Sequence, residues 1–429
     1  MNVVDAVPFD SISILGLGVE GKTCALRLAE MGFKVYASDL RKDLDVSDLE
    51  NLDNVKIDLG RHDPDAIAET DVAYVSPSAP RDSPAFKAVE KAGVPLLEDV
   101  ITWPDDSDFI AITGTNGKTT TVLMTSYILE ELNVEHEVGG NAGGGFDGYA
   151  TLYVLAEATS PEVVVCEVCD MTLGYFVERG PKPTVAALTN VGLDHMDHHG
   201  SLENLIESAA EFLNVADVAV LRCDADPDAK VANMVDVRKV CYDRLEIDPP
   251  FKSRVYRWNA KAAVAVSCEV TGRDPDELVD VLEGFRPADG RVVELILDDG
   301  RVVVGKTDNP SALESVLRDF GPLEVVFWGT PRPGEWFRVE GVGRILARHG
   351  VERVYVFPGL SRETIDDVVR EMERAGLTVE GVADPEEVPN LVMEELKGGV
   401  NSIGVLGNGQ DVITWIQKRL EEAAKEVVF

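Results

Sequence analysis

Lys118 and Thr119 stand at the end of a glycine-rich turn, Gly114-Thr115-Asn116-Gly117, in a pattern that could bind phosphate. Successive backbone N–H groups in such a turn, followed by a helix N-terminus, form an anion site. The Lys118 ammonium adds positive charge for the outer phosphates, and the Thr119 hydroxyl can ligate Mg²⁺. The stretch therefore predicts a loop that binds a nucleoside triphosphate, against the alternative of an ordinary turn with two chance glycines.

The segments on both sides of this loop are those that a phosphate-binding loop requires. Asp108-Phe109-Ile110 is a short apolar run typical of a buried strand. Val122 to Leu129 has apolar residues at helical spacing, so a helix is predicted to begin near Lys118 and to end near Leu132. Only Thr115 and Asn116 separate Gly114 from Gly117, whereas most phosphate-binding loops have four residues there.

A second glycine-rich turn lies near the N-terminus. Gly16-Leu17-Gly18-Val19-Glu20-Gly21 follows the predicted strand Ser11–Leu15 and precedes a predicted helix, Lys22–Met31. Asp39 follows the next predicted strand, 18 positions after the last glycine. Alone, this pattern favours NAD or FAD binding, and the alternative is close helix–strand packing without a ligand.

Two further places carry carboxylates or histidines that could bind a metal. Glu167 lies in the apolar strand predicted at Val163–Val168, where a lone buried carboxylate is costly unless a cation compensates it. The second place is Asp194-His195-Met196-Asp197-His198-His199, which follows the strand predicted at Val185–Asn190. Its chemistry alone is compatible with zinc. We expect His198 and His199 to lie on the surface.

Length and charge limit the remaining possibilities. A chain of 429 residues predicts two to three domains, and a net charge of −37 disfavours binding to nucleic acid or anionic membrane. The six cysteines show no disulfide framework, and Cys166 and Cys169 are expected to pack in the core. We recognise no signal peptide and no 18-residue apolar span, so we expect a cytoplasmic protein. Such acidity also suggests a salt-rich cytosol.

Several of these motifs resemble those of the Mur ligase family, which joins amines to carboxylates through an acyl phosphate at the expense of ATP. The resemblance rests on Gly114 to Thr120, on Asn190-x-x-x-Asp194-His195-x-Asp197, on the helix that begins at Trp258-Asn259 and on Asn309-Pro310. It is nearest to the MurC and MurD types. It implies an α/β architecture of three domains: a Rossmann-like UDP-substrate domain (1–102), a P-loop ATP-binding domain (103–288) with a linker at Trp103–Ser107, and a Rossmann-like acceptor domain (289–429).

The resemblance also implies roles for individual residues. Lys118, His195 and Arg291 would act in catalysis, and Thr119, Glu167 and His195 would bind Mg²⁺, with Asp194 and Asp197 as support. The ATP-binding residues implied are Gly114, Thr115, Asn116, Gly117, Lys118, Thr119, Thr120, Asn259, Arg291 and Asn309. The residues implied for the UDP-linked substrate are Gly16, Gly18, Val19, Gly21, Asp39, Ser76 and Asn141. The cofactors implied are ATP and Mg²⁺, the second substrate is an amino acid, and a monomer is expected.

The sequence departs from the family at several places. Ala209 occupies the position of a lysine that most members carbamylate, and neither Glu207 nor Glu211 falls in register to replace it. Gly305 replaces an aspartate, so Lys306 or Asp308 would have to substitute for it. The usual acceptor-binding motifs near the C-terminus are missing.

The acidic, divergent character favours an archaeal pseudomurein peptide ligase. The alternatives are a ligase or cyclase for another carboxylate, such as a methanogen nickel-tetrapyrrole precursor, a non-catalytic nucleotide-binding homologue, and an NAD-dependent oxidoreductase.

Overall fold

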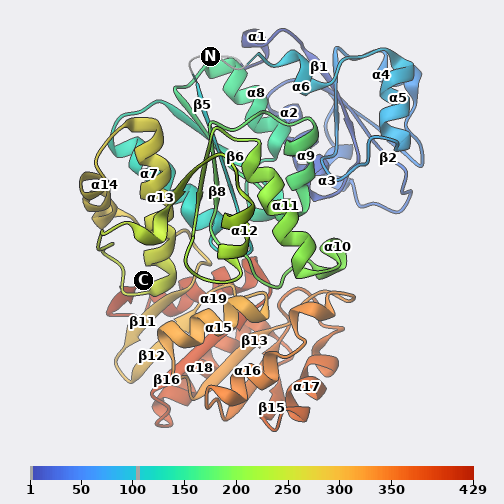
Figure 1. The fold of residues 1–429 in the computed structure, drawn as a ribbon. Coiled ribbons are helices and arrows are strands. Elements are labelled where there is room, and N and C mark those ends of the chain that lie inside the picture. The colour runs from blue at the N-terminus through green and yellow to red at the C-terminus, as the bar shows by residue number, and fades with distance from the viewer. Residues whose placement is uncertain (1–2, 103–106) are drawn as a thin grey trace. The chain divides into compact units, whose positions relative to one another are not determined.

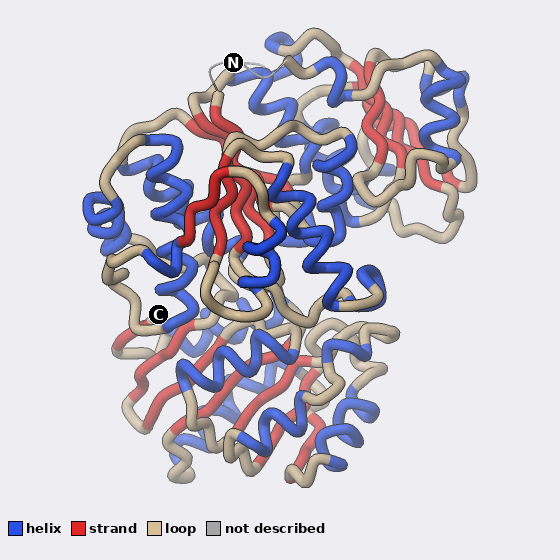
Figure 2. The backbone as a smooth tube through the Cα atoms, in the orientation of Figure 1, coloured by secondary structure: helices blue, strands red, loops and turns tan. Residues whose placement is uncertain are grey.

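The computed structural model describes residues 3–102 and 107–429, so most of the linker predicted at 103–107 lies outside the described residues. The chain forms two compact units. The first contains residues 1–191, 203–247 and 260–282, and the second contains residues 192–202, 248–259 and 283–429. Figure 1 shows the helices and strands with their labels, and Figure 2 shows the strands of each sheet running side by side.

The first sheet lies in the first unit and is entirely parallel, with strand order β3-β2-β1-β4. Its two central strands, β1 and β2, are apolar runs that are almost completely buried, as expected for a parallel sheet covered on both faces. The elements are α1 (Val3–Ala6), β1 (Ser11–Leu15), α2 (Val19–Glu30), β2 (Lys34–Asp39), α3 (Ser47–Glu50), β3 (Val55–Leu59), α4 (Pro64–Ile67), β4 (Val72–Val75), α5 (Pro84–Ala92) and α6 (Leu97–Val100).

The second sheet, also in the first unit, has six parallel strands in the order β10-β9-β8-β5-β7-β6. Strand β5 lies at its centre, so the loop that leaves β5 is flanked by the carboxyl ends of β7 and β8. The elements are β5 (Asp108–Thr113), α7 (Lys118–Glu131), β6 (His136–Gly140), η1 (Ala142–Gly144), α8 (Tyr149–Thr159), β7 (Val163–Glu167), η2 (Asp170–Thr172), α9 (Leu173–Glu178), β8 (Val185–Leu188), α10 (Met196–His199), α11 (Leu202–Asn214), β9 (Val218–Leu221), α12 (Asp228–Met234), β10 (Arg238–Cys241), η3 (Tyr242–Arg244), α13 (Arg254–Thr271), α14 (Pro275–Val281) and η4 (Leu282–Gly284).

The third sheet belongs to the second unit and has the order β15-β14-β13-β16-β12-β11-β17. It is parallel except for β11, which runs antiparallel to β12 and β17. Apolar clusters cover both of its faces. The elements are β11 (Val293–Leu297), β12 (Gly300–Val304), α15 (Pro310–Phe320), β13 (Val325–Gly329), η5 (Trp336–Arg338), α16 (Val342–Arg348), β14 (Arg353–Phe357), α17 (Ile365–Arg374), β15 (Thr378–Gly381), η6 (Pro385–Glu387), α18 (Val388–Lys397), β16 (Ser402–Gly407), α19 (Gln410–Glu421) and β17 (Glu426–Val428).

The three α/β sheets confirm the predicted fold class. The expected core positions of Cys166 and Cys169 are also confirmed, because both thiols are buried. Within the described residues, no helix is both long and apolar enough to cross a bilayer.

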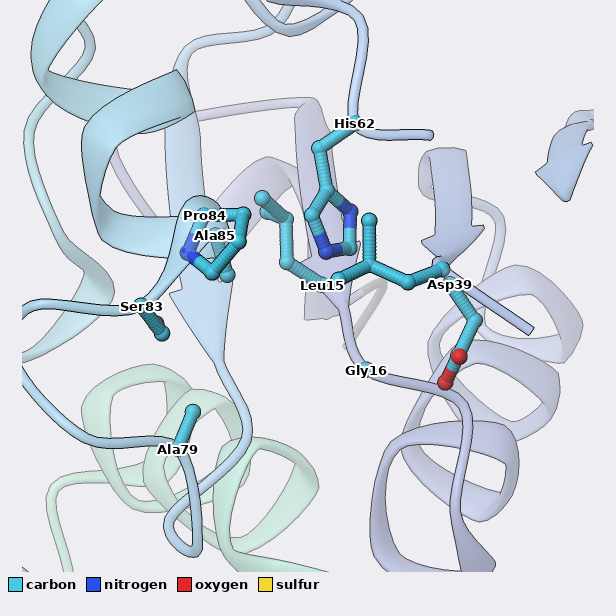
Figure 3. Close-up of a pocket in the computed structure, with 9 residues that line it drawn as sticks. Leu15, Gly16, Asp39, His62, Ala79, Ser83, Pro84 and Ala85 are labelled. Atoms are coloured by element: carbon cyan, nitrogen blue, oxygen red, sulfur yellow. The ribbon is translucent and has the colours of Figure 1, made fainter. Parts of the chain in front are cut away.

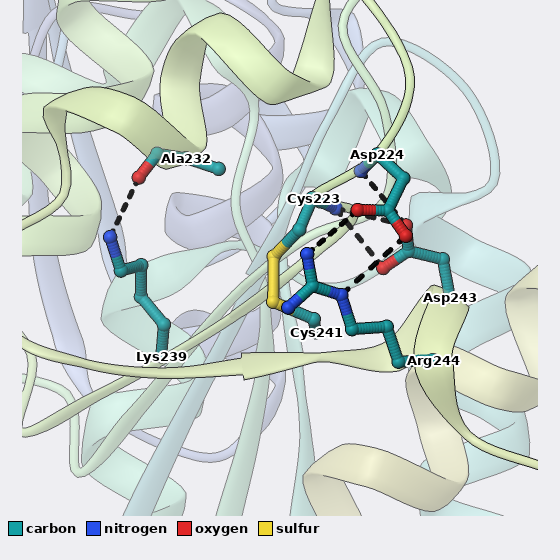
Figure 4. Close-up of a disulfide and its surroundings, with 7 residues drawn as sticks. All are labelled: Cys223, Asp224, Ala232, Lys239, Cys241, Asp243 and Arg244. Carbon is teal, nitrogen blue, oxygen red and sulfur yellow. Dashed lines mark hydrogen bonds and ion pairs between the residues drawn. A yellow bond between two sulfur atoms is a disulfide. The ribbon is translucent and has the colours of Figure 1, made fainter.

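The expectation of no disulfide is wrong, because Cys223 and Cys241 form one (Figure 4). The two cysteines lie 18 residues apart in the sequence, and the parallel register that places Leu221 opposite Cys241 brings their Cα atoms to 5.5 Å. The spacing of the two cysteines in the sequence does not indicate this disulfide, because the pairing depends on β9 and β10 being neighbours in the sheet.

Candidate active site

The loop after β5 has the backbone that a phosphate site needs. Gly114 has φ +137°, and a Cβ there would lie 2.1 Å from the Thr189 Oγ1, so no larger residue fits. Gly117 has φ +85° and is the N-cap of α7. The Lys118 Nζ donates to the carbonyls of Gly114 (2.6 Å) and Thr115 (3.1 Å), which holds its charge over the loop. The α7 N-terminus therefore presents backbone N–H groups and an ammonium to the same place.

Two residues at the end of β8 hold this loop in shape. The Asn190 carbonyl accepts from the Thr115 N–H at 2.9 Å. The Asn190 side chain exchanges two hydrogen bonds with the Asn116 backbone, at 3.1 and 2.8 Å. The Thr189 hydroxyl adds a third, to the Asn116 carbonyl at 2.6 Å. Sequence analysis gave these two residues no role in the loop, although their place after the strand next to β5 is a usable signal.

Asp228 holds the same segment from its other side. Its carboxylate accepts from the Val191 N–H at 2.6 Å and lies 3.5 Å from Arg222. Burial raises the pKa of Asp228 to about 6, although that hydrogen bond and Arg222 oppose the shift. The nearby Tyr242 hydroxyl donates to the Thr189 carbonyl. The disulfide at Cys241 is adjacent in sequence to Tyr242, so a covalent link lies beside the segment that shapes the loop.

Glu167 lies at the carboxyl end of β7, next to β5, and its side chain is completely buried. Its Oε1 accepts from the Asn141 Nδ2 at 2.8 Å, and its Oε2 is buried with no hydrogen-bond partner in the part of the chain that the structure describes. A Cβ on Gly144 would lie 1.9 Å from Oε1, so the turn after Asn141 closes tightly over the carboxylate. A buried carboxylate oxygen without a donor fits a divalent cation, which would supply the missing compensation.

Glu207 and Glu211, which do not fall in register with the missing lysine in the sequence, also face away from its position in the structure. Ala209 packs its side chain into the core on α11, whereas Glu207 and Glu211 on the same helix are exposed. An α-helix turns about 100° per residue, so positions two apart from a buried residue face solvent here. Neither glutamate therefore substitutes at the Ala209 position.

The glycines of the N-terminal loop have different physical roles. A Cβ on Gly16 would lie 2.9 Å from the Ser76 Cβ, and one on Gly21 would lie 1.9 Å from the Gly16 carbonyl oxygen, so both are required for packing. At Gly18, the N-cap of α2, a Cβ would meet nothing within 4 Å. Val19 beside it is exposed. Only the Gly18 segment therefore leaves room for a ligand to approach the backbone.

The Asp39 carboxylate is already hydrogen-bonded to backbone N–H groups on both sides of it. It accepts from the Leu17 N–H at 2.7 Å and from the Arg41 N–H at 2.9 Å. Partial burial opposes its ionisation, but the hydrogen bonds from Arg41 and Leu17 hold the pKa of Asp39 below its usual value. A cavity of about 170 Å³ opens beside it (Figure 3). The cavity is lined by Leu15, Gly16, Asp39, Leu40, His62, Ala79 and Ser83 to Ala85.

In the second unit, His195 has φ +47°, a strained conformation for a residue with a side chain. Its N–H bonds to the Asp194 carboxylate at 3.0 Å, and Asp194 in turn accepts from the Asn309 Nδ2 at 3.1 Å. Asn309 also caps α15 through the Ala312 N–H. The structure thus joins two of the predicted motifs. The surface position expected for His199 is wrong: it is buried, whereas His198 is exposed, because successive residues of α10 face different directions.

Other predicted residues of the second unit lie on separate elements. Asn259 is buried in α13. Arg291 is half-buried, and its Nε is buried with no hydrogen-bond acceptor among the described residues. A guanidinium nitrogen in that condition is suited to an anionic ligand.

A charged cluster stands at the carboxyl ends of β12 and β16 in the same unit. Asp308 lies 3.0 Å from Lys306 and 3.1 Å from Arg338, which donates to the Asn408 side chain at 3.3 Å. Although burial opposes it, these two cations hold the pKa of Asp308 well below its usual value. The chain reverses direction across the sheet between β13 and β16, and ligands of such sheets bind at that point.

Comparison with known proteins agrees with this geometry. A family model described as Mur ligase middle domain matches residues 112–248, and one described as Mur ligase MurD-like, N-terminal domain matches residues 10–98. The UDP-N-acetylmuramoylalanine–D-glutamate ligase of Geotalea daltonii is 30% identical, over 79% of this chain and 81% of that protein. The enzyme of the same name from Ligilactobacillus salivarius is 25% identical, over 92% and 90%.

Solved structures share the fold. The pseudomurein peptide ligase type C from Methanothermus fervidus has a TM-score of 0.57 at 19% identity, over 96% of this chain and 100% of that one. The UDP-N-acetylmuramate–alanine ligase MurC from Thermotoga maritima has a TM-score of 0.59 at 18% identity, over 96% and 98%. At these identities the likeness shows the architecture alone.

Proposed function

Because the chain belongs to the Mur ligase family of ATP-dependent acid–amino-acid ligases, we propose that it joins an amino acid to the carboxylate of a UDP-linked precursor of peptidoglycan or pseudopeptidoglycan. The match of residues 10–98 to a MurD-like N-terminal domain carries this proposal. The open backbone at Gly18 and the cavity beside Asp39 support it, because they would admit a diphosphate and a base. The acidity of the chain favours the archaeal, pseudomurein version.

In this reaction the substrate carboxylate attacks the γ-phosphorus of ATP and ADP leaves. The amine then attacks the carbonyl carbon of the acyl phosphate, loses a proton and displaces inorganic phosphate. Lys118 and Arg291 would stabilise the negative charge of the transferring phosphoryl group. Thr119, Glu167 and His195 would hold Mg²⁺, which when bound neutralises phosphate charge.

The acceptor amino acid would bind at the cluster of Lys306, Asp308 and Arg338. The cluster offers cations for a carboxylate and an anion for an ammonium group, within one sheet edge. An amino acid carries both groups, so the charges are complementary.

The test is ADP formation from Mg²⁺-ATP with a panel of UDP-linked sugars and peptides crossed with amino acids. We expect turnover that requires one UDP compound and one amino acid together. ATP binding without turnover for any pair would contradict the proposal. It would favour a non-catalytic homologue, for which the buried Ala209 in place of the family's lysine already argues.

A further inference from the structure

Glu20 makes contacts that the proposed reaction does not explain. It lies in the first turn of α2, directly after Gly18 and Val19, where a carboxylate would repel a bound diphosphate. Its side chain turns away to the segment between β6 and α8. Oε1 accepts from the Tyr149 N–H at 2.6 Å, and Oε2 accepts from the Ala142 N–H at 3.2 Å. Glu20 is therefore hydrogen-bonded to both ends of the segment 142–149.

The segment that Glu20 binds follows Asn141, the residue that orients Glu167. Asn141 precedes Ala142 and bonds to Glu167 twice, through its N–H to the Glu167 carbonyl at 2.9 Å and through its Nδ2 to Oε1 at 2.8 Å. The Asn141 side chain thus fixes which carboxylate oxygen is satisfied and which remains free. Gly148 closes the segment through the Gly140 carbonyl at 2.9 Å.

Sterics make this arrangement specific to the residues present. A Cβ on Gly148 would lie 2.3 Å from the Cys24 Sγ and 3.1 Å from the Glu20 Oε1. Together with the close approach of Gly144 to Glu167, this leaves the segment little room to shift while Glu20 holds it. Both oxygens of the Glu20 carboxyl group accept from backbone N–H groups, whereas a glutamine amide in the same place offers only one acceptor oxygen.

We propose that Glu20 is a positioning residue for the metal site: through residues 141–149 it sets the orientation in which Glu167 presents its free oxygen to Mg²⁺. The inference rests on the proposed function for the role of Glu167. It implies that the turn proposed to hold the diphosphate and the metal ligand form one connected structure, although 147 positions separate Glu20 from Glu167.

The experiment compares Glu20→Gln with Glu90→Gln, a control at an exposed glutamate of α5 in the same unit. Glu30 on α2 is not used, because it pairs with Arg27, which also binds Asp147 of the segment under test. Mn²⁺ binding to the full-length protein with saturating ADP is followed by the loss of the free-Mn²⁺ electron paramagnetic resonance signal. We expect Glu20→Gln to weaken Mn²⁺ binding about 10-fold or more, the effect of losing a residue that orients a ligand, and Glu90→Gln to leave it unchanged. Hydrogen exchange of residues 141–149 without metal should rise only in Glu20→Gln.

The outcomes separate this inference from the proposed function. If Glu20→Gln exchanges faster at 141–149 but binds Mn²⁺ within twofold of wild type, Glu20 only joins two parts of the fold and the inference fails alone. If the wild-type protein binds no Mn²⁺ with ADP, the proposed metal site fails as well. Should Glu20→Gln not fold, Asn141→Ala tests the same link and is expected to give the same 10-fold loss; unchanged affinity there overturns the inference.

Discussion

The chain carries Gly-Lys-Thr three times. The copy at Gly305-Lys306-Thr307 precedes α15, whereas the other two lie at the start of a helix that follows a parallel strand. In Gly117-Lys118-Thr119 the lysine is the first residue of α7, and its Nζ lies over the loop carbonyls. In Gly21-Lys22-Thr23 the helix has already begun at Val19, so the lysine is the fourth residue of α2. Its Nζ bonds to the Asp45 carbonyl and pairs with Asp48, each at 3.0 Å. The position of the tripeptide relative to the helix start therefore decides whether its lysine can serve a phosphate.

The two loops are also held by different carboxylates. Asp39 binds the N-terminal loop and is stabilised in its charged form, whereas Asp228 binds the segment beside the second loop and is destabilised in its charged form. The N-terminal loop is thus held by Asp39, whose charge is stabilised by Arg41 and by backbone N–H groups. The phosphate-binding loop is held through Asp228, whose hydrogen bond from Val191 and ion pair with Arg222 do not fully offset the cost of burying its charge.

The largest expected effect distinguishes the two lysines. We expect Lys118→Ala to lower kcat/KM for Mg²⁺-ATP by about 1,000-fold, ~4 kcal/mol, because the charge that meets the γ-phosphoryl group is lost. Lys22→Ala should change it less than about threefold, because surface ion pairs contribute little. Steady-state ADP formation measures both, with circular dichroism to verify folding. An equal fall of kcat/KM in the two variants would show that the two lysines do not differ in their role toward ATP.

The glycines give the second contrast. We expect Gly114→Ala to lower the free energy of unfolding by about 2–3 kcal/mol, because its Cβ meets Thr189 and its φ is positive. Gly18→Ala should leave that free energy within about 1 kcal/mol but weaken binding of the UDP-linked substrate. Denaturant unfolding and calorimetric titration test the two statements. Undiminished substrate affinity in Gly18→Ala would show that the ligand does not approach this backbone.

The last contrast concerns pH. The folded pKa of Asp228 is raised to about 6, so its contribution to stability is present at low pH and is lost as pH rises between about 4 and 6. The stability of wild type relative to Asp228→Asn should therefore fall by about 2–3 kcal/mol over that range and then remain level. The lowered pKa of Asp39 predicts the opposite: its contribution is constant from pH 4 to 7 and is lost only at lower pH. Unfolding curves of Asp228→Asn and Asp39→Asn at each pH check the contrast, and parallel profiles would contradict it.

The sequence by itself determined the fold class and the position of several buried parallel strands. Buried strands are short apolar runs, and a glycine turn between such a run and a helical pattern is a local signal. The predicted strand Ser11–Leu15 is β1 at the same bounds, and the helix predicted from Lys118 to about Leu132 is α7, which ends at Glu131. Edge strands such as β3 and β10 were missed, because their half-buried residues do not form a continuous apolar run.

Tertiary structure alone decided what surrounds the candidate site. Asn190 meets Asn116 across 74 positions, and Glu20 meets Tyr149 across 129. The Cys223–Cys241 disulfide depends on β9 and β10 being neighbours. These contacts follow from strand order and side-chain packing, which no sequence spacing specifies. Local patterns could thus indicate the loop, but only the folded sheet shows which side chains hold the loop and Glu167 in place.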